Sequence, residues 1–232
     1  MPSSPSPAPD LAIAPPLAVR AVGGFGTSIA IGVALGAGAR FADGLAYPLG
    51  LLIPANAIGV WLGTAFILGG SARTIPTGAL RGVIGLLSAV AAYYVLIAIF
   101  GQGYRAIGAS HAATIWGAVA LLAGPVMGAA GASWRHGTGW PRAIGVAILA
   151  SALFAEGFVF GAPRLIHVDQ LAYDPGAILY AAEMALGLAL PWLLLRRGER
   201  LHGYVAAAGL AVIAAAAIGP VTSILRGLAD RF

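Results

Sequence analysis

The sequence predicts an all-α protein, a polytopic bundle of about seven transmembrane helices with Gly-rich packing. Hydrophobic residues make up 59% of the 232 residues and charged residues only 9%, whereas a soluble domain carries about 25% charged residues. The mean hydropathy is +0.90. The apolar residues also gather in separate runs of roughly 20, the length with which a helix crosses the ~30 Å hydrocarbon core of a bilayer. Roughly six to eight helices fit this pattern, and seven is the expected count.

The chain is expected to start with a tail and to continue as one membrane domain. Residues 1–19 are rich in Pro, Ser and Ala and lack the basic-then-apolar order of a signal peptide. We therefore expect a retained, disordered tail, followed by a single transmembrane domain at 20–232. Within it, apolar runs predict spans at residues 21–39, 49–72, 78–100, 110–133, 141–161, 175–195 and 203–225.

Local residues define several of these boundaries. Arg40 ends the first span, because a charged side chain is costly in hydrocarbon. The stretch 44–55 is apolar but contains Pro and Gly, so it either enters the membrane as a half-helix or lies at its surface. Pro141 and Pro175 open the fifth and sixth spans, since proline suits the first turn of a helix.

The arginines predict the orientation of the bundle. With the N-terminus inside, eight arginines fall in inner segments and five in outer segments, which the positive-inside rule favours. The N-terminus is therefore expected on the cytoplasmic side. Trp134, Trp140 and Trp192 fall beside the inner arginines, where interfacial aromatic residues belong.

Two missing residue types exclude several functions. The chain has no cysteine, which rules out disulfides and thiolate metal sites, and no lysine, which rules out a retinal Schiff base. The net charge of +5 is spread over short loops, so nucleic acid is not an expected partner. His167, Asp169 and Asp174 have no metal-ligand spacing. No cofactor and no metal site are predicted.

Glycine patterns predict how the helices contact one another. Helices in lipid associate through close backbone approach, which small residues allow. Gly32 and Gly36 have GxxxG spacing in the first span. The fourth span carries a glycine stripe at positions 117, 124, 128 and 131, which is expected to be a packing seam.

Two acidic residues lie well inside predicted spans, Glu156 in the fifth and Glu183 in the sixth. Ionisable groups in a bilayer are expensive and are functional candidates by default. Both lie roughly 8–11 Å below the outer surface at about 1.5 Å per residue, on helices joined by a short loop. Either the two carboxyl groups meet in one pocket, where they could share a proton, or each is bonded separately and fastens helices together.

Aromatic and polar residues of other spans are expected at the same depth. They would form the wall of a binding pocket, since aromatic faces attract cations. The candidate ligand-binding residues are Asn56, Trp61, Tyr93, Tyr94, His111, Trp116 and Tyr180.

Several segments resemble a group of small actinobacterial integral membrane proteins catalogued as a domain of unknown function. The resemblance covers about residues 20–200. Its best marks are Asn56 with Trp61, the pair Tyr93–Tyr94, the GPxxGxxGxxxR run at 124–135 and the AEG at 155–157. It implies an all-helical membrane fold and a bacterium of high-GC genome, and it implies no activity. The expected location is the bacterial cytoplasmic membrane.

Three functions are compatible with the sequence. The first is a small-molecule binder or transporter whose outer carboxylate and aromatic pocket takes a small hydrophobic or cationic ligand. The second is a membrane-embedded enzyme acting on a lipid or isoprenoid, with Glu156 and Glu183 as catalytic acids in the manner of a terpene cyclase. The third is a structural or accessory subunit, which would have no cavity. Beyond the lipid bilayer, the sequence identifies no protein partner.

Overall fold

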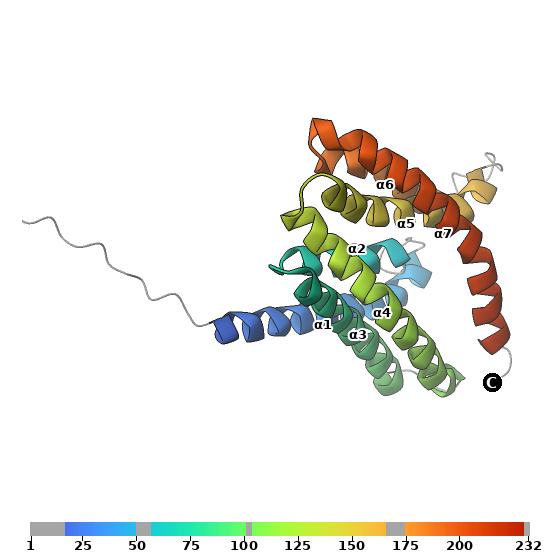
Figure 1. Cartoon of the computed structure of the whole chain (residues 1–232). Coiled ribbons are helices and arrows are strands. Elements are labelled where there is room, and N and C mark those ends of the chain that lie inside the picture. The colour runs from blue at the N-terminus through green and yellow to red at the C-terminus, as the bar shows by residue number, and fades with distance from the viewer. Residues whose placement is uncertain (1–16, 50–56, 101–103, 166–174, 230–232) are drawn as a thin grey trace, which may run out of the picture.

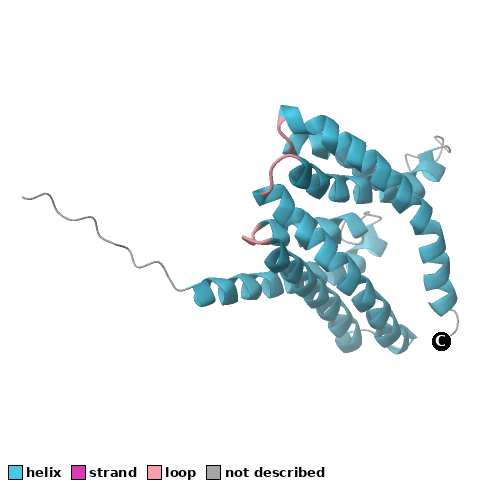
Figure 2. Cartoon of the chain, viewed as in Figure 1, coloured by secondary structure: helices cyan, strands magenta, loops and turns pink. Residues whose placement is uncertain are grey.

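The computed structural model describes residues 17–49, 57–100, 104–165 and 175–229 of the chain. Within these residues it contains seven α-helices and no strand (Figures 1 and 2), which confirms the predicted all-α bundle. A short 3₁₀ helix, η3, joins the sixth helix to the seventh. In chain order the elements are α1 (Leu17–Leu49), α2 (Ile58–Gly70), α3 (Ile75–Phe100), α4 (Tyr104–His136), α5 (Trp140–Leu165), α6 (Pro175–Leu194), η3 (Arg197–Glu199) and α7 (Arg200–Ala229).

Five helices contain a segment that is long and apolar enough to cross a membrane. These segments are Gly24–Asp43, Ile75–Phe100, Ser110–His136, Trp140–Ala162 and Gly176–Leu194. They confirm the spans predicted in α1 and in α3 to α6. The predicted seventh span lies in α7, whose side chains are described only as far as Ala216, so it stays a prediction.

The second predicted span was wrong in length. Helix α2 has 13 residues, about 20 Å at 1.5 Å per residue, which is less than the ~30 Å core of a bilayer. Helix α1 continues beyond Arg40, the predicted end of the first span, to Leu49, and its candidate span is described as far as Asp43. Within the stretch 44–55, residues 44–49 are thus the end of α1, and 50–55 lie outside the described residues.

The predicted tail lies mostly outside the described residues. Helix α1 begins at Leu17, so the last residues of the stretch 1–19 are helical. Nothing in the structure tests whether 20–232 form one domain, and this boundary stays a prediction.

Glycines bring the helices into backbone contact. A Cβ atom on Gly32 or Gly36 of α1 would overlap carbonyl oxygens of α3, those of Gly85 and Ala89. The numbers of the contacting residues increase in the same direction along both helices, so α1 and α3 run parallel. Helix α3 runs antiparallel to α4 through a second seam, in which Gly82 faces Gly124 and Gly78 faces Gly128.

The glycine stripe of α4 is a packing seam at three of its four positions. Gly124 and Gly128 lie against α3, and a Cβ on Gly131 would overlap the carbonyl oxygen of Phe66 in α2. The prediction was wrong for Gly117, because a Cβ there would meet no described atom within 4 Å. The close glycine contacts of the stripe therefore lie only in the half of α4 that ends at His136.

The other three helices form a second group beside α4 (Figure 1). Helices α5 and α6 are antiparallel, since Gly157 contacts Tyr180 and Gly187 contacts Ala150. Helix α5 also contacts α4 and α7 and touches the start of α2. The contacts of α5 with α4 and α2 join the two groups of helices, and the contact with α2 positions the candidate site.

Candidate functional site

The two candidate glutamates, Glu156 and Glu183, lie against the first turn of α2. Oε1 of Glu156, on α5, accepts a hydrogen bond of 2.9 Å from the backbone amide of Ile58, and the amide of Gly59 donates to the same carboxylate. A Cβ on Gly59 would lie 2.7 Å from Oε1 of Glu183, which comes from α6. Only 5% of Glu156 and 6% of Glu183 are exposed. The structure therefore brings the two carboxyl groups together at one helix end.

The start of α2 requires an acceptor because it is recessed in the bundle. The N-cap residue, Ala57, forms no side-chain cap hydrogen bond. The first amide groups of a helix have no partner within the helix, and in a low-dielectric interior an unpaired amide is costly. Helix α5 continues for about 14 Å beyond Glu156 at about 1.5 Å per residue, so the α2 start lies well below the end of its neighbour. Glu156 thus caps α2 from another helix.

Each glutamate also has one oxygen without a hydrogen-bond partner among the described residues. These atoms are Oε2 of Glu156 and Oε2 of Glu183. The positive end of the α2 dipole favours negative charge at this place, and two adjacent carboxylates disfavour it. A pair of this kind can stabilise the helix start and still accept a proton.

An aromatic cavity of about 320 Å³ begins at the same turn of α2 and lies between α2, α3 and α4. This is within the usual range of small-molecule sites, about 300–1,000 Å³. Trp61 and Tyr93 meet edge to face at 6.4 Å between ring centroids, and Tyr93 and Tyr94 at 5.0 Å. The lining residues are Ile58, Trp61, Leu62, Leu86, Val90, Tyr93, Tyr94, Trp116, Val119, Ala120 and Ala123.

The predicted site residues therefore divide between two places. Trp61, Tyr93, Tyr94 and Trp116 line the aromatic cavity, whereas the two glutamates lie against the α2 start and are not among the lining residues. Ile58 belongs to both places, because its amide binds Glu156 and its side chain lines the cavity.

Two other predicted residues, Tyr180 and His111, are not among the described lining residues. Tyr180 packs in the α5–α6 seam, with its ring 5.7 Å from that of Phe160 and its Cβ against Gly161. His111 belongs to α4, outside the set of lining residues. Asn56 lies outside the described residues. The position of each residue along its predicted span placed these side chains at the same depth in the membrane. The rotation of each helix about its own axis decides which way they face.

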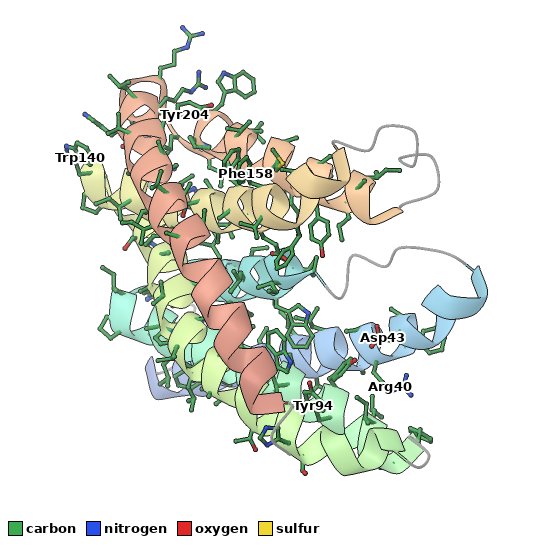
Figure 3. The ribbon with its side chains drawn as sticks, turned by 90° about the vertical axis from the view of Figure 1, so that its right-hand side faces the viewer. Arg40, Asp43, Tyr94, Trp140, Phe158 and Tyr204 are labelled. Atoms are coloured by element: carbon green, nitrogen blue, oxygen red, sulfur yellow. The ribbon has the colours of Figure 1, made fainter. Side chains whose placement is uncertain are left out.

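The sequence analysis missed a polar pair at the edge of the cavity. The hydroxyl of Tyr93 donates a hydrogen bond to Oδ2 of Asp43, on α1. Arg40 lies one helical turn before Asp43, and Figure 3 shows both at the same end of the bundle as Tyr94. The pair was overlooked because Arg40 was read as the end of a span. Arg40 and Asp43 are three residues apart and share one face of a helix, and this spacing is the signal that indicates a continued helix.

The bond between Tyr93 and Asp43 is expected to couple α1 to α3. We expect a double-mutant cycle with Tyr93→Phe and Asp43→Asn to give a coupling energy of about 1.5–3 kcal/mol, the net value of a hydrogen bond to a charged group. The measurement is the free energy of unfolding in detergent micelles for the four proteins. Additive effects of the two substitutions would contradict the bond.

No group of three or more His, Asp or Glu side chains among the described residues is arranged to hold a metal ion. The described residues contribute carboxyl groups, aromatic rings and one recessed helix end to the site.

The comparisons with known proteins concern the family of the chain. No curated protein and no solved structure gives a significant match. The sequence model of one family matches residues 15–227 and is described as a family of unknown function. This confirms the resemblance to a group of unknown function, while an actinobacterial origin stays a prediction. Because the match covers nearly all of the sequence, the chain belongs to this family of unknown function, DUF6518.

Proposed function

We propose that this membrane protein binds a small hydrophobic cation in the aromatic cavity, as the ligand site of a transporter. The observation that carries the proposal is the cavity itself. It lies between three helices, is partly open, and is lined by four aromatic residues, Trp61, Tyr93, Tyr94 and Trp116. Such a wall is apolar enough to shelter an organic molecule, and its ring faces attract positive charge.

The charges around the cavity favour a cation over an anion. Asp43 accepts the hydrogen bond from Tyr93, and Glu156 binds the amide of Ile58, so acidic groups lie directly behind two lining residues. The charge of Arg40 also acts on Tyr93 and offsets part of this negative charge. Glu183 adds a second carboxyl group beside Gly59. A cation in the cavity would be attracted by these groups as well as by the rings.

The recessed helix supports transport as the purpose of binding. Many transporters use short or interrupted helices that start inside the bundle, next to the binding site. Helix α2 has this form, and its first turn touches both the carboxyl pair and the cavity. In the proposed mechanism, the Glu156–Glu183 pair holds the proton that is exchanged when a ligand enters or leaves.

The two alternatives have less support. An enzyme that uses Glu156 or Glu183 as its acid needs a carboxyl group at the cavity wall, and the described lining residues contain none. An accessory subunit needs no cavity. We further propose a bacterial cytoplasmic membrane with the N-terminus inside, which places the cavity toward the outer half of the bilayer.

We expect radiolabelled tetraethylammonium to bind the protein in phosphatidylcholine nanodiscs, measured by scintillation proximity. Substitution Trp61→Ala should weaken binding about tenfold, because one cation–π contact is worth up to about 2 kcal/mol in a desolvated site. Trp140→Ala is the matched control. It removes the same side chain from the opposite end of the bundle from Arg40 and Asp43 (Figure 3) and should leave binding unchanged.

Competition with 3,3-diethylpentane, a neutral molecule of the same shape, tests the charge. Strong competition would assign the cavity to apolar ligands instead. Absence of binding, or equal binding by the Trp61 variant, would refute the proposed site. Uptake of the same label into proteoliposomes then separates a transporter from a binding protein.

A further inference from the structure

A surface with excess positive charge lies at the end of the bundle where α5 starts, α6 ends and α7 starts. We call it the arginine surface and define it by Arg142, Arg196, Arg197 and Arg200. Trp140 stacks on His202 at 4.4 Å between ring centroids, which holds the start of α5 beside the start of α7. Figure 3 shows Trp140 at the opposite end of the bundle from Arg40 and Asp43.

One acidic residue, Glu199, connects the elements of this surface. Its Oε1 accepts a 2.9 Å hydrogen bond from the amide of Gly139, and its Oε2 accepts one of 3.4 Å from the amide of Arg196. The same Oε2 lies 3.9 Å from Nε of Arg142. Both carboxylate oxygens are therefore already used within the protein. Four arginines against this single carboxylate leave a local excess of positive charge.

The arginines differ in how they are held. Arg196 and Arg197 are exposed. Arg200 is oriented by two contacts, since its Nε lies 3.4 Å from the carbonyl oxygen of Leu195 and its guanidinium lies 5.1 Å from the Trp192 ring. A guanidinium group that is already oriented loses little freedom when it binds a phosphate, and its fork of donors matches phosphate oxygens.

Two tryptophans place this surface at the level of lipid headgroups. Trp140, at the start of α5, is 50% exposed, and Trp192, near the end of α6, is 56% exposed. These two rings flank the arginine surface. Tryptophan is enriched where hydrocarbon meets water, because its ring is apolar and its N–H is polar. A ligand here meets apolar rings on its membrane side and guanidinium groups on its water side.

We propose that the arginine surface binds the headgroup of an anionic phospholipid. A lipid phosphate satisfies the guanidinium groups while its glycerol and first acyl carbons contact Trp140 and Trp192. A free phosphate ion would use the charges and leave the rings unoccupied. Basic surfaces at the ends of transmembrane helices are attracted to anionic lipids by about 1 kcal/mol per arginine, about fivefold in affinity. This site is separate from the aromatic cavity, so neither proposal depends on the other.

The test uses the full-length protein in a neutral detergent and native mass spectrometry. Phosphatidylglycerol and phosphatidylcholine with the same acyl chains are titrated separately. We expect the wild-type protein to bind phosphatidylglycerol more tightly than phosphatidylcholine by about 25-fold or more. The double variant Arg196→Gln/Arg197→Gln should lose about 25-fold in affinity for phosphatidylglycerol, at about fivefold per arginine, and keep its affinity for phosphatidylcholine.

The matched control is the double variant Arg73→Gln/Arg135→Gln. Both arginines are exposed, and they lie at the α2–α3 turn and near the end of α4, outside the arginine surface. The control removes the same charge and should retain phosphatidylglycerol binding to within about threefold, which supports a defined site. Equal losses in the two double variants, or equal affinity of the wild-type protein for both lipids, would overturn the proposal. Displacement of phosphatidylglycerol by millimolar inorganic phosphate would assign the site to a free anion and overturn it as well.

Discussion

Replacement of Glu156 by alanine is expected to lower the free energy of unfolding by about 3 kcal/mol. The substitution removes the acceptor for the amides of Ile58 and Gly59 at the recessed start of α2. A buried amide without an acceptor costs about 1–3 kcal/mol, and loss of a helix cap alone costs about 1 kcal/mol. The measurement is equilibrium unfolding in mixed micelles, followed by circular dichroism.

Two further variants separate the cap from the charge. Glu156→Gln keeps a carbonyl oxygen that can accept the same hydrogen bonds, so it should cost less than half as much as alanine. Glu183→Gln is the companion at the neighbouring carboxyl group, where no hydrogen bond to the α2 backbone is seen among the described residues. Its effect on stability should stay within about 1 kcal/mol. If Glu156→Ala is as stable as the wild-type protein, the capping assignment is wrong.

These variants also separate structural and functional roles of the pair. If Glu183→Gln folds normally and still abolishes proton-driven uptake of tetraethylammonium, the carboxyl pair serves transport as well as stability. If uptake is unchanged, Glu156 and Glu183 are fastening residues, and the aromatic cavity works without them.

Replacement of Gly131 by alanine is expected to destabilise the bundle by about 3 kcal/mol or more. The added Cβ would overlap the carbonyl oxygen of Phe66 and lie 2.8 Å from the amide nitrogen of Gly70, both in α2. Backbone atoms cannot rotate out of the way as a side chain can, so α2 and α4 must separate. Overpacking of a well-packed interior costs about 1–3 kcal/mol, and a clash with backbone belongs at the upper end.

Gly117→Ala is a matched control on the same helix. Gly117 has no described atom within 4 Å of the added Cβ. Alanine also favours the helix over glycine by about 0.5–1 kcal/mol, so this variant should be as stable as the wild-type protein or slightly more stable. Unfolding curves of the two variants, recorded in the same micelles, should differ by about 3 kcal/mol or more. Equal curves would contradict the seam between α2 and α4.

Several features of this protein follow from its sequence alone. The apolar runs that became α3, α4, α5 and α6 were predictable because spanning a bilayer requires about 20 apolar residues. The shared depth of Glu156 and Glu183 was predictable too, because depth along a helix follows from the rise of about 1.5 Å per residue. The glycines at 124, 128 and 131 could be assigned to a seam by spacing, since close helix contact needs small residues.

Only the tertiary structure decided which side chains meet. A helix surrounded by lipid and protein is apolar on all sides, so its sequence carries little information about its rotation. In the structure, one cavity is lined by four of the predicted aromatic residues, Trp61, Tyr93, Tyr94 and Trp116. Tyr180 instead faces the α5–α6 seam, and the sequence did not reveal this difference. The partner of the first α2 amides was also visible only in the tertiary structure. An apolar run longer than α2 was available in the sequence, but the helix starts at Ile58, where a carboxylate on α5 accepts its first amides.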